Sequence, residues 1–304
     1  MADVETGLPS VSSVERRCSF HLFVRTAYHL LYFLGHNAVL CWAMYIWYKI
    51  GDASTKHPVI QNLKYLAPAF FTNWNFTFQT VFLGLSLLYD LLEWFDKHTG
   101  NVAVKIRYWR DVLFCSAVVP FTLFVTSMFW SVYAIDRELV FPTIYDEVVP
   151  WWFNHCVHTN IVVVLLLETL LQARRKPTDE KVEQTIYWGV AFAYAVVYYT
   201  IYFATHRWLY QVFGVMTWWQ VCIYQIFIWG ISYVFYLLQF PINRLIHGQE
   251  EEKSLEQKED TANSVAQKSD TGKVITDLKA PPFSTRSWSL KFRSLRNQFE
   301  TSRL

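Results

Sequence analysis

Residues 151–171 read WWFNHCVHTNIVVVLLLETLL. At 1.5 Å per residue this stretch is long enough to cross the ~30 Å hydrocarbon core of a bilayer as one helix. Tryptophans open it, as they do at membrane interfaces. Two histidines and two asparagines nevertheless lie in its first half, beside Thr159: Asn154, His155, His158 and Asn160. Polar residues inside a membrane helix are costly and usually serve a function, so this stretch predicts both a membrane helix and a site.

The composition of the whole chain agrees with a membrane protein. Of its 304 residues, 53% are hydrophobic and only 17% are charged, below the roughly 25% charged residues of a soluble domain. Five further apolar segments are long enough to span a bilayer, at about residues 28–47, 66–88, 112–134, 186–203 and 217–240. We therefore predict an all-α, multi-pass membrane helix bundle with about six transmembrane helices.

The charge pattern predicts the orientation of the chain. Lys and Arg gather in the flanks at residues 16–25, 97–110 and 174–181 and at Arg244, and are sparser at 49–64, 137 and 207. By the positive-inside rule, both termini should be cytosolic. The predicted parts are a cytosolic arm (1–24), a transmembrane domain (25–247) and a polar, disordered cytosolic tail (248–304). Within the tail, residues 286–299 fit either a basic amphipathic helix on a membrane surface or a disordered basic end.

A second polar group lies in residues 71–84, FTNWNFTFQTVFLG. Thr72, Asn75 and Gln79 are spaced i, i+3 and i+7, so they share one face of a helix. In the predicted topology this helix and residues 151–171 run in the same direction, and Thr72 and His158 lie at similar depth. A hydroxyl and an imidazole at one level can act together, with neutral His158 as base and Thr72 as nucleophile on an ester. Asn75 or Asn154 could orient the histidine or donate to an oxyanion.

Less specialised roles fit the same residues. A threonine in a membrane helix commonly bonds to its own backbone, and histidines bond to polar groups on neighbouring helices. His155 and His158 could also hold a metal, but no carboxylate-bearing helix partners them, so we expect no metal and no cofactor. Ion transport would require a carboxylate near the middle of the bilayer, and none is evident. The five cysteines are odd in number and unpaired in spacing, which indicates free thiols.

Two of these stretches also carry a family resemblance. Residues 129–159 contain Phe-Trp, Arg137, Pro142, Asp146 and an Asn-His-x-x-His-Thr sequence, and residues 71–84 contain Thr-x-x-Asn-x-x-x-Gln. With these motifs the chain resembles the family of androgen-induced gene and androgen-dependent TFPI-regulating proteins, over about residues 64–238. A third motif, RWLYQVF at 207–213, has the Trp-x-Tyr of the family, but Gln211 stands where relatives have proline.

The resemblance implies an activity and roles for particular residues. It suggests a membrane threonine hydrolase of lipid esters, namely fatty acid esters of hydroxy fatty acids, at the plasma membrane or in the endomembrane system. It assigns Thr72 as nucleophile and His158 as the essential histidine, with Asn75, Asn154 and His155 left as orienting or oxyanion residues. The expected partners are the lipid ester and the bilayer, without nucleic acid. A non-enzymatic membrane regulator and a small-molecule transporter remain the alternatives, and the oligomeric state is open.

Overall fold

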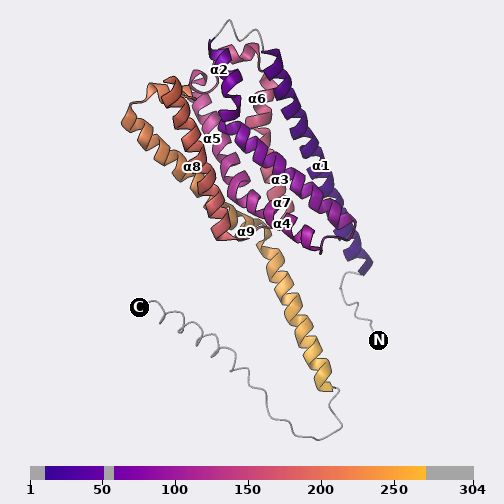
Figure 1. Ribbon diagram of the computed structural model, residues 1–304. Coiled ribbons are helices and arrows are strands. Elements are labelled where there is room, and N and C mark those ends of the chain that lie inside the picture. The colour runs from indigo at the N-terminus through magenta and orange to yellow at the C-terminus, as the bar shows by residue number, and fades with distance from the viewer. Residues whose placement is uncertain (1–10, 51–57, 272–304) are drawn as a thin grey trace, which may run out of the picture. The chain divides into compact units, whose positions relative to one another are not determined.

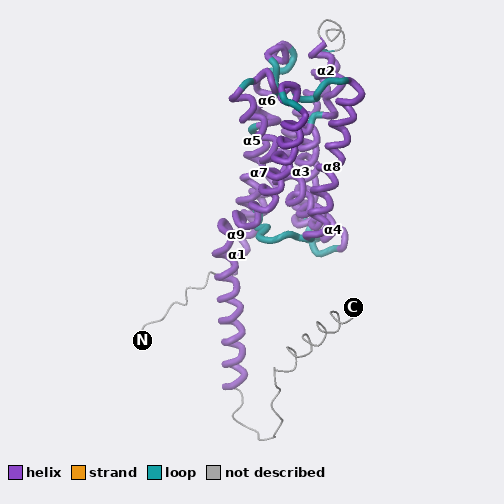
Figure 2. Tube along the Cα trace, turned by 90° about the vertical axis from the view of Figure 1, so that its left-hand side faces the viewer, coloured by secondary structure: helices purple, strands orange, loops and turns teal. Residues whose placement is uncertain are grey.

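A computed structural model describes the chain over residues 11–50 and 58–271, and every regular element in those ranges is a helix. The chain divides into two compact units, residues 1–249 and 250–304. All the predicted membrane helices belong to the first unit, where they form a bundle (Figures 1 and 2). The all-α prediction is thus confirmed.

The helices follow one another along the chain with short connections. They are α1 (Val11–Lys49), α2 (Pro58–Leu66), η2 (Ala67–Ala69), α3 (Phe71–Trp94), α4 (Asn101–Leu113), η3 (Phe114–Val118), α5 (Val119–Ile135), η4 (Arg137–Leu139), η5 (Thr143–Glu147), α6 (Trp151–His158), α7 (Asn160–Leu171), α8 (Glu180–Thr205), η6 (Gln211–Val215) and α9 (Trp218–Thr271). α1 begins inside the predicted N-terminal arm. α9 continues into the polar segment for which composition predicts disorder, whereas residues 286–299 lie outside the described ranges.

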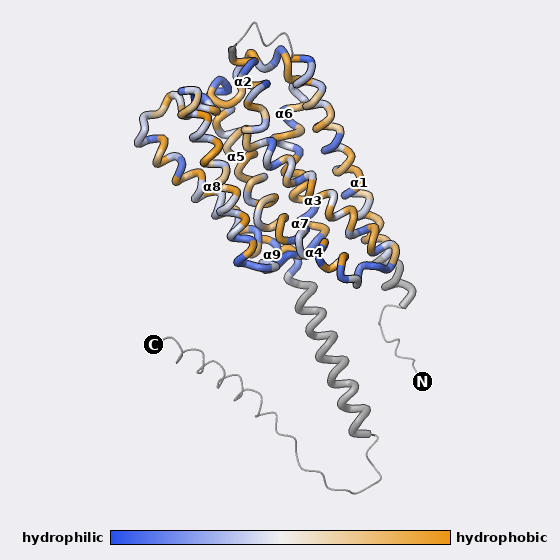
Figure 3. The backbone as a smooth tube through the Cα atoms, in the orientation of Figure 1, coloured by the Kyte–Doolittle hydropathy of each residue, from blue (hydrophilic) through white to orange (hydrophobic). Residues whose placement is uncertain are grey.

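Five stretches are long and apolar enough to cross a membrane: Ser19–Lys49, Asn101–Ile135, Trp151–Leu171, Glu180–Thr205 and Trp218–Gly248. They correspond to five of the six predicted spans. The sixth corresponds to α3, a 24-residue helix that carries several polar residues and is not among the five. α3 packs against α1, α4 and α5 inside the bundle. Figure 3 shows hydrophobic residues along the helices and hydrophilic ones gathered toward the ends of the bundle.

Helices α3 and α6 both begin at the end of the bundle where α2 lies, and both run away from it (Figure 1). This agrees with the predicted shared direction of the two segments. The start of the second span differs from the prediction, because α3 begins at Phe71 and not near residue 66. Pro68 lacks a backbone N–H and disfavours helical geometry at the residue before it, so the chain makes the short turn η2 first. Thr72 is therefore the second residue of α3.

The regular α-helical geometry of two long spans is interrupted inside the bundle. The stretch Asn101–Ile135 contains a π-helical turn, η3, two residues before Pro120, whose missing N–H breaks the regular ladder. The stretch Trp151–Leu171 breaks at Thr159, between α6 and α7. The break frees the carbonyl of His158, which accepts a hydrogen bond of 2.8 Å from Thr126 Oγ1 on α5.

A buried network of charges, which we call the charge cluster, ties the other end of the bundle together. Arg174, in the connection after α7, donates to Glu168 at 2.7 Å and to Asp111 at 2.8 Å. His29 on α1 lies between two carboxylates, 2.6 Å from Asp90 and 3.0 Å from Glu168. The cluster comprises Arg25, His29, Asp90, Glu93, Arg110, Asp111, Glu168 and Arg174.

The charges of this cluster balance if His29 is protonated. Carboxylates only accept hydrogen bonds, so an imidazole with a carboxylate at each nitrogen must donate from both nitrogens, which makes it a cation. Burial by itself lowers the pKa of Arg174, but the negative charges of Asp111 and Glu168 raise it by more. The net effect is a pKa above the ordinary value, so this guanidinium stays charged. Arg25 and Arg174, which belong to the basic flanks of the predicted spans, are only 7% and 8% exposed.

We expect Arg174→Ala to lower the free energy of unfolding by about 3–5 kcal/mol, because it leaves Glu168 and Asp111 buried without their partner. The matched control is Arg137→Ala, whose exposed pair with Asp146 spans 2.9 Å and should contribute about 1 kcal/mol or less. Thermal unfolding of both variants in detergent measures the difference. Equal losses of stability would contradict a supporting role for the charge cluster.

The orientation of the bundle remains a prediction from the Lys and Arg pattern. A tag at the C-terminus should resist protease added to intact cells and should be digested once the plasma membrane alone is permeabilised. Digestion in intact cells, or protection after permeabilisation, would show the opposite orientation.

Candidate functional site

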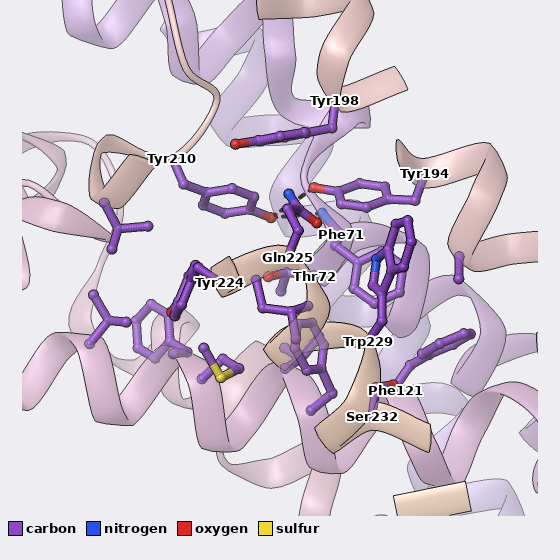
Figure 4. A pocket seen from close by; sticks show the side chains of 18 of the residues that line it. Phe71, Thr72, Phe121, Tyr194, Tyr198, Tyr210, Tyr224, Gln225, Trp229 and Ser232 are labelled. Atoms are coloured by element: carbon purple, nitrogen blue, oxygen red, sulfur yellow. Dashed lines mark hydrogen bonds between the residues drawn. The ribbon is translucent and has the colours of Figure 1, made fainter. Parts of the chain in front are cut away.

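An apolar pocket of about 130 Å³ lies between α3, α5, α8 and α9, and Thr72 and His158 both line it. Figure 4 shows Thr72 among the aromatic side chains of the pocket. Most of its wall consists of aromatic and aliphatic side chains, including Phe121, Phe129 and Tyr187. An engineered apolar cavity of about 150 Å³ binds benzene, so this pocket has room for a short stretch of hydrocarbon.

The hydroxyl of Thr72 is left available by the way in which α3 begins. Thr77 and Thr80, further along the helix, each donate to the carbonyl four residues earlier, at 2.8 Å. Thr72 is only the second residue of α3, so no full helical turn precedes it. The carbonyl of Pro68, four residues before Thr72, accepts instead from Trp74 Nε1 at 2.9 Å. The usual backbone bond of a membrane threonine is therefore missing at Thr72 among the described residues.

The imidazole of His158 is held by stacking. It is the last residue of α6, and only 7% of it is exposed. Its ring lies parallel to that of Phe129, with 3.5 Å between the ring centroids and 8° between the planes. Within the described part of the chain, its Nδ1 is buried without a hydrogen-bond partner. The ring orientation is thus set by an aromatic neighbour and not by a polar one.

Thr72 and His158 share the pocket, and no hydrogen bond joins them in the part of the chain that the structure describes. Hydrogen bonds between catalytic groups are often long before substrate binds and tighten in the complex. The arrangement brings together a free hydroxyl, a buried imidazole and an apolar wall. These are the chemical groups that a nucleophile, a base and a lipid-binding surface require.

The other three predicted site residues do not line the pocket, as far as the structure describes the chain. Asn75 is fully buried, and its Oδ1 accepts a hydrogen bond from Thr122 Oγ1 on α5 at 3.2 Å. Asn154 is buried at 8% exposure. His155 is exposed, with its Nδ1 3.2 Å from Thr159 Oγ1. The two histidines of the His-x-x-His sequence therefore have different surroundings.

Among the side chains that the structure describes, no group of three or more His, Cys, Asp or Glu is arranged to hold a metal ion. The charge cluster consists of paired acidic and basic groups, each bound to an opposite charge.

One wall of the pocket was not anticipated from the sequence. Tyr210, just before η6, accepts a hydrogen bond of 3.0 Å from the backbone N–H of Phe71. Tyr194 on α8 donates to the Tyr210 hydroxyl at 3.2 Å, and Gln225 and Ser232 on α9 also line the pocket. The Trp-x-Tyr motif that contains Tyr210 was a usable signal. The pocket residues on α8 and α9 have no such signal in the sequence, because tyrosines and tryptophans are common throughout these helices.

Comparison with known proteins gives a family match. Residues 30–244 match the family described as FAR-17a/AIG1-like protein. The chain is 30% identical over 219 residues to the androgen-dependent TFPI-regulating protein of Homo sapiens, covering 68% of this chain and 90% of the relative. It is 32% identical over 188 residues to the protein of that name from Rattus norvegicus, covering 60% of this chain and 78% of the relative.

A shorter match, 31% identical over 114 residues, links it to the androgen-induced gene 1 protein of Homo sapiens, covering 36% of this chain and 48% of the relative. No solved structure matches the chain. The family match covers both Thr72 and His158 and most of the helical bundle. The chain is therefore a multi-pass membrane protein that belongs to the FAR-17a/AIG1-like family.

Proposed function

We propose that this protein hydrolyses lipid esters inside the membrane, with Thr72 as nucleophile and His158 as general base. The observation that carries the proposal is that these two residues, from α3 and α6, line the same apolar pocket. A threonine hydroxyl is a weak nucleophile and needs a neighbouring base. The free hydroxyl at the start of α3 and the buried imidazole at the end of α6 supply this pair.

The reaction proceeds in two steps. Thr72 Oγ1 forms a bond to the ester carbonyl carbon while His158 takes the hydroxyl proton, and the carbonyl electron pair moves onto its oxygen. When that pair returns, the bond to the alcohol breaks, and the alcohol leaves with the proton from His158. Water then attacks the acyl-threonine in the same manner, with His158 again as base, and releases the fatty acid and Thr72.

The local electrostatics support a nucleophile at this position. Thr72 lies in the first turn of a 24-residue helix, where the helix dipole favours negative charge. The apolar wall excludes water, and charge interactions are stronger in such low-dielectric surroundings. The dipole at the start of α3 therefore favours the alkoxide character that Thr72 develops as it attacks, and the low dielectric strengthens this attraction.

The pocket indicates which part of the substrate it holds. In the described part of the chain no Asp, Glu, Lys or Arg lines the pocket, so a fatty acid carboxylate would remain outside while an acyl chain enters. An ester in the middle of a long hydrocarbon substrate meets this requirement. Fatty acid esters of hydroxy fatty acids have this chemistry and are the class that the family resemblance suggests.

The two alternatives make different demands. Relatives carry the name TFPI-regulating protein, and a non-enzymatic regulator needs neither a free hydroxyl nor a base in the pocket. A transporter of charged solutes needs charged groups along its path, whereas the described lining of the pocket is almost entirely apolar. Covalent labelling by a fluorophosphonate separates an enzyme from both.

We expect Thr72→Ala and His158→Ala each to lower the rate of lipid ester hydrolysis by about 10³-fold or more, because each removes one half of a catalytic unit. The double variant should be no worse than either single one, since effects within such a unit are not additive. Hydrolysis by purified protein in detergent, with fatty acid release measured by mass spectrometry, provides the rates.

The matched controls lie one or two turns away. Thr77→Ala removes a threonine that donates to the Asn73 carbonyl, and His155→Ala removes the exposed histidine. Thr77→Ala should keep the wild-type rate, and His155→Ala should lose activity only in part. A well-expressed Thr72→Ala protein that hydrolyses at the wild-type rate would refute the mechanism.

A further inference from the structure

The hydroxyls of Tyr210 and Tyr194 meet on the wall of the pocket beside the start of α3. Figure 4 shows the two side chains pointing toward each other, with Phe71, Thr72 and Gln225 close by. Tyr210 accepts from the N–H of Phe71 at 3.0 Å, and Phe71 is the residue immediately before Thr72. The pair is therefore attached to the same helical turn that presents the Thr72 hydroxyl.

Counting protons in this pair leaves one without an acceptor. A phenol has one O–H donor and two acceptor lone pairs. The lone pairs of Tyr210 are engaged by the Phe71 N–H at 3.0 Å and by the Tyr194 hydroxyl at 3.2 Å. With Tyr194 as the donor of the pair, the proton of Tyr210 points elsewhere, and no residue in the described part of the chain accepts it. Because Tyr210 lines the pocket, that proton is available to a bound molecule.

The position of this donor is fixed before any substrate arrives. The ring of Tyr210 packs edge-on against Phe70, with 5.6 Å between the centroids. The ring of Tyr194 packs against Phe71 at 4.5 Å and against Trp74 at 5.5 Å. Burial also raises the pKa of Tyr210, so its phenol keeps its proton at neutral pH. A donor held in this way loses little freedom when it binds, which is the property of an effective oxyanion site.

We propose that Tyr210 donates a hydrogen bond to the oxyanion that forms when Thr72 attacks the ester carbonyl, and that Tyr194 positions Tyr210. This inference rests on the proposed function. It assigns a role that Asn75 and Asn154 cannot fill from their places outside the pocket.

The proton stays on Tyr210 throughout the reaction. As the Thr72 oxygen bonds to the carbonyl carbon, the carbonyl electron pair becomes a lone pair on oxygen, and the Tyr210 O–H bond points at that negative charge. When the intermediate collapses, the pair reforms the carbonyl and the leaving alcohol takes its proton from His158. Tyr210 thus binds the transition state more strongly than the ground state, which raises the rate of the chemical step.

A purely structural role for Tyr210 must be separated from this one, because its hydroxyl also satisfies the first N–H of α3. The matched control is Tyr108, whose hydroxyl donates to Asp179 at 3.2 Å. Asp179 is the N-cap residue of α8, so Tyr108→Phe removes a tyrosine hydroxyl that is bonded at the start of another helix. It should leave kcat unchanged.

The experiment compares Tyr210→Phe, Tyr194→Phe and Tyr108→Phe by kcat, KM, thermal unfolding and the rate of fluorophosphonate labelling. Tyr210→Phe should lower kcat by about 10²–10³-fold with KM close to wild type, as removal of one oxyanion donor does. Labelling should slow in parallel, because attack on the probe also places negative charge on an oxygen. Tyr194→Phe should lower kcat less than Tyr210→Phe does, since Tyr210 keeps its proton.

If Tyr210→Phe and Tyr108→Phe have the same kcat while Thr72→Ala is inactive, the inference is wrong and the proposed function stands. If Thr72→Ala is active, the proposed function itself fails. Should Tyr210→Phe not fold, a tetrafluorinated tyrosine at position 210 keeps both hydrogen bonds but ionises at lower pH. Its kcat should then fall at alkaline pH where that of the wild type does not, and identical pH profiles would overturn the inference.

Discussion

The fold depends on the pairing of Arg174 with Glu168 and Asp111 in the charge cluster. Lipid tails are as apolar as the helix surfaces, so the hydrophobic effect does not hold membrane helices to one another. Packing and buried polar contacts must do so. Arg174 joins the end of α7 to α4 through its side chain, and its backbone N–H donates to Asn243 on α9 at 2.6 Å. Arg25 and His29 connect α1 to the charge cluster, and Asp90 connects α3 to it.

Every charge in such a cluster must have a partner, because a buried charge without one is far more costly than a missing contact. This requirement sets the register of the helices, since sliding one of them by a single turn would separate several pairs at once. The nearly complete burial of His29, Asp90 and Glu168, each 0% exposed, makes the penalty large. The cluster therefore specifies which helix ends meet, beyond any stability that it contributes.

The pocket lies toward the opposite end of α3. Thr72 and Asp90 are separated by ~27 Å along the helix at 1.5 Å per residue, so the charge cluster can hold the helices without filling the pocket. Between them, Gln79 donates to the Ile161 carbonyl at 2.9 Å and bonds to His36 at 2.8 Å. α8 and α9 form the far wall of the pocket, and they are buried less than the stretch that contains α4 and α5. In the proposed function, this less buried wall is the side from which the hydrocarbon chain of the substrate would enter.

The sequence by itself determined the helical class, the apolar segments, the shared direction of α3 and α6, and the choice of Thr72 and His158 as the residues of interest. These follow from local composition, helical periodicity and motif. Asn75 shows the limit of periodicity. Three residues along a helix rotate by about 300°, so Asn75 lies about 60° from Thr72 on the helix surface, and only the packing of α5 decides that it faces Thr122 instead of the pocket.

Arg25 and Arg174 show a second limit, because a basic residue beside an apolar segment has the same sequence pattern whether it faces water or a buried carboxylate. Tertiary structure alone decided their partners and the meeting of Tyr210 with Phe71. Each of these joins residues far apart in the chain or depends on a neighbouring helix. No local pattern encodes such a contact, since its energy exists only once the helices have packed.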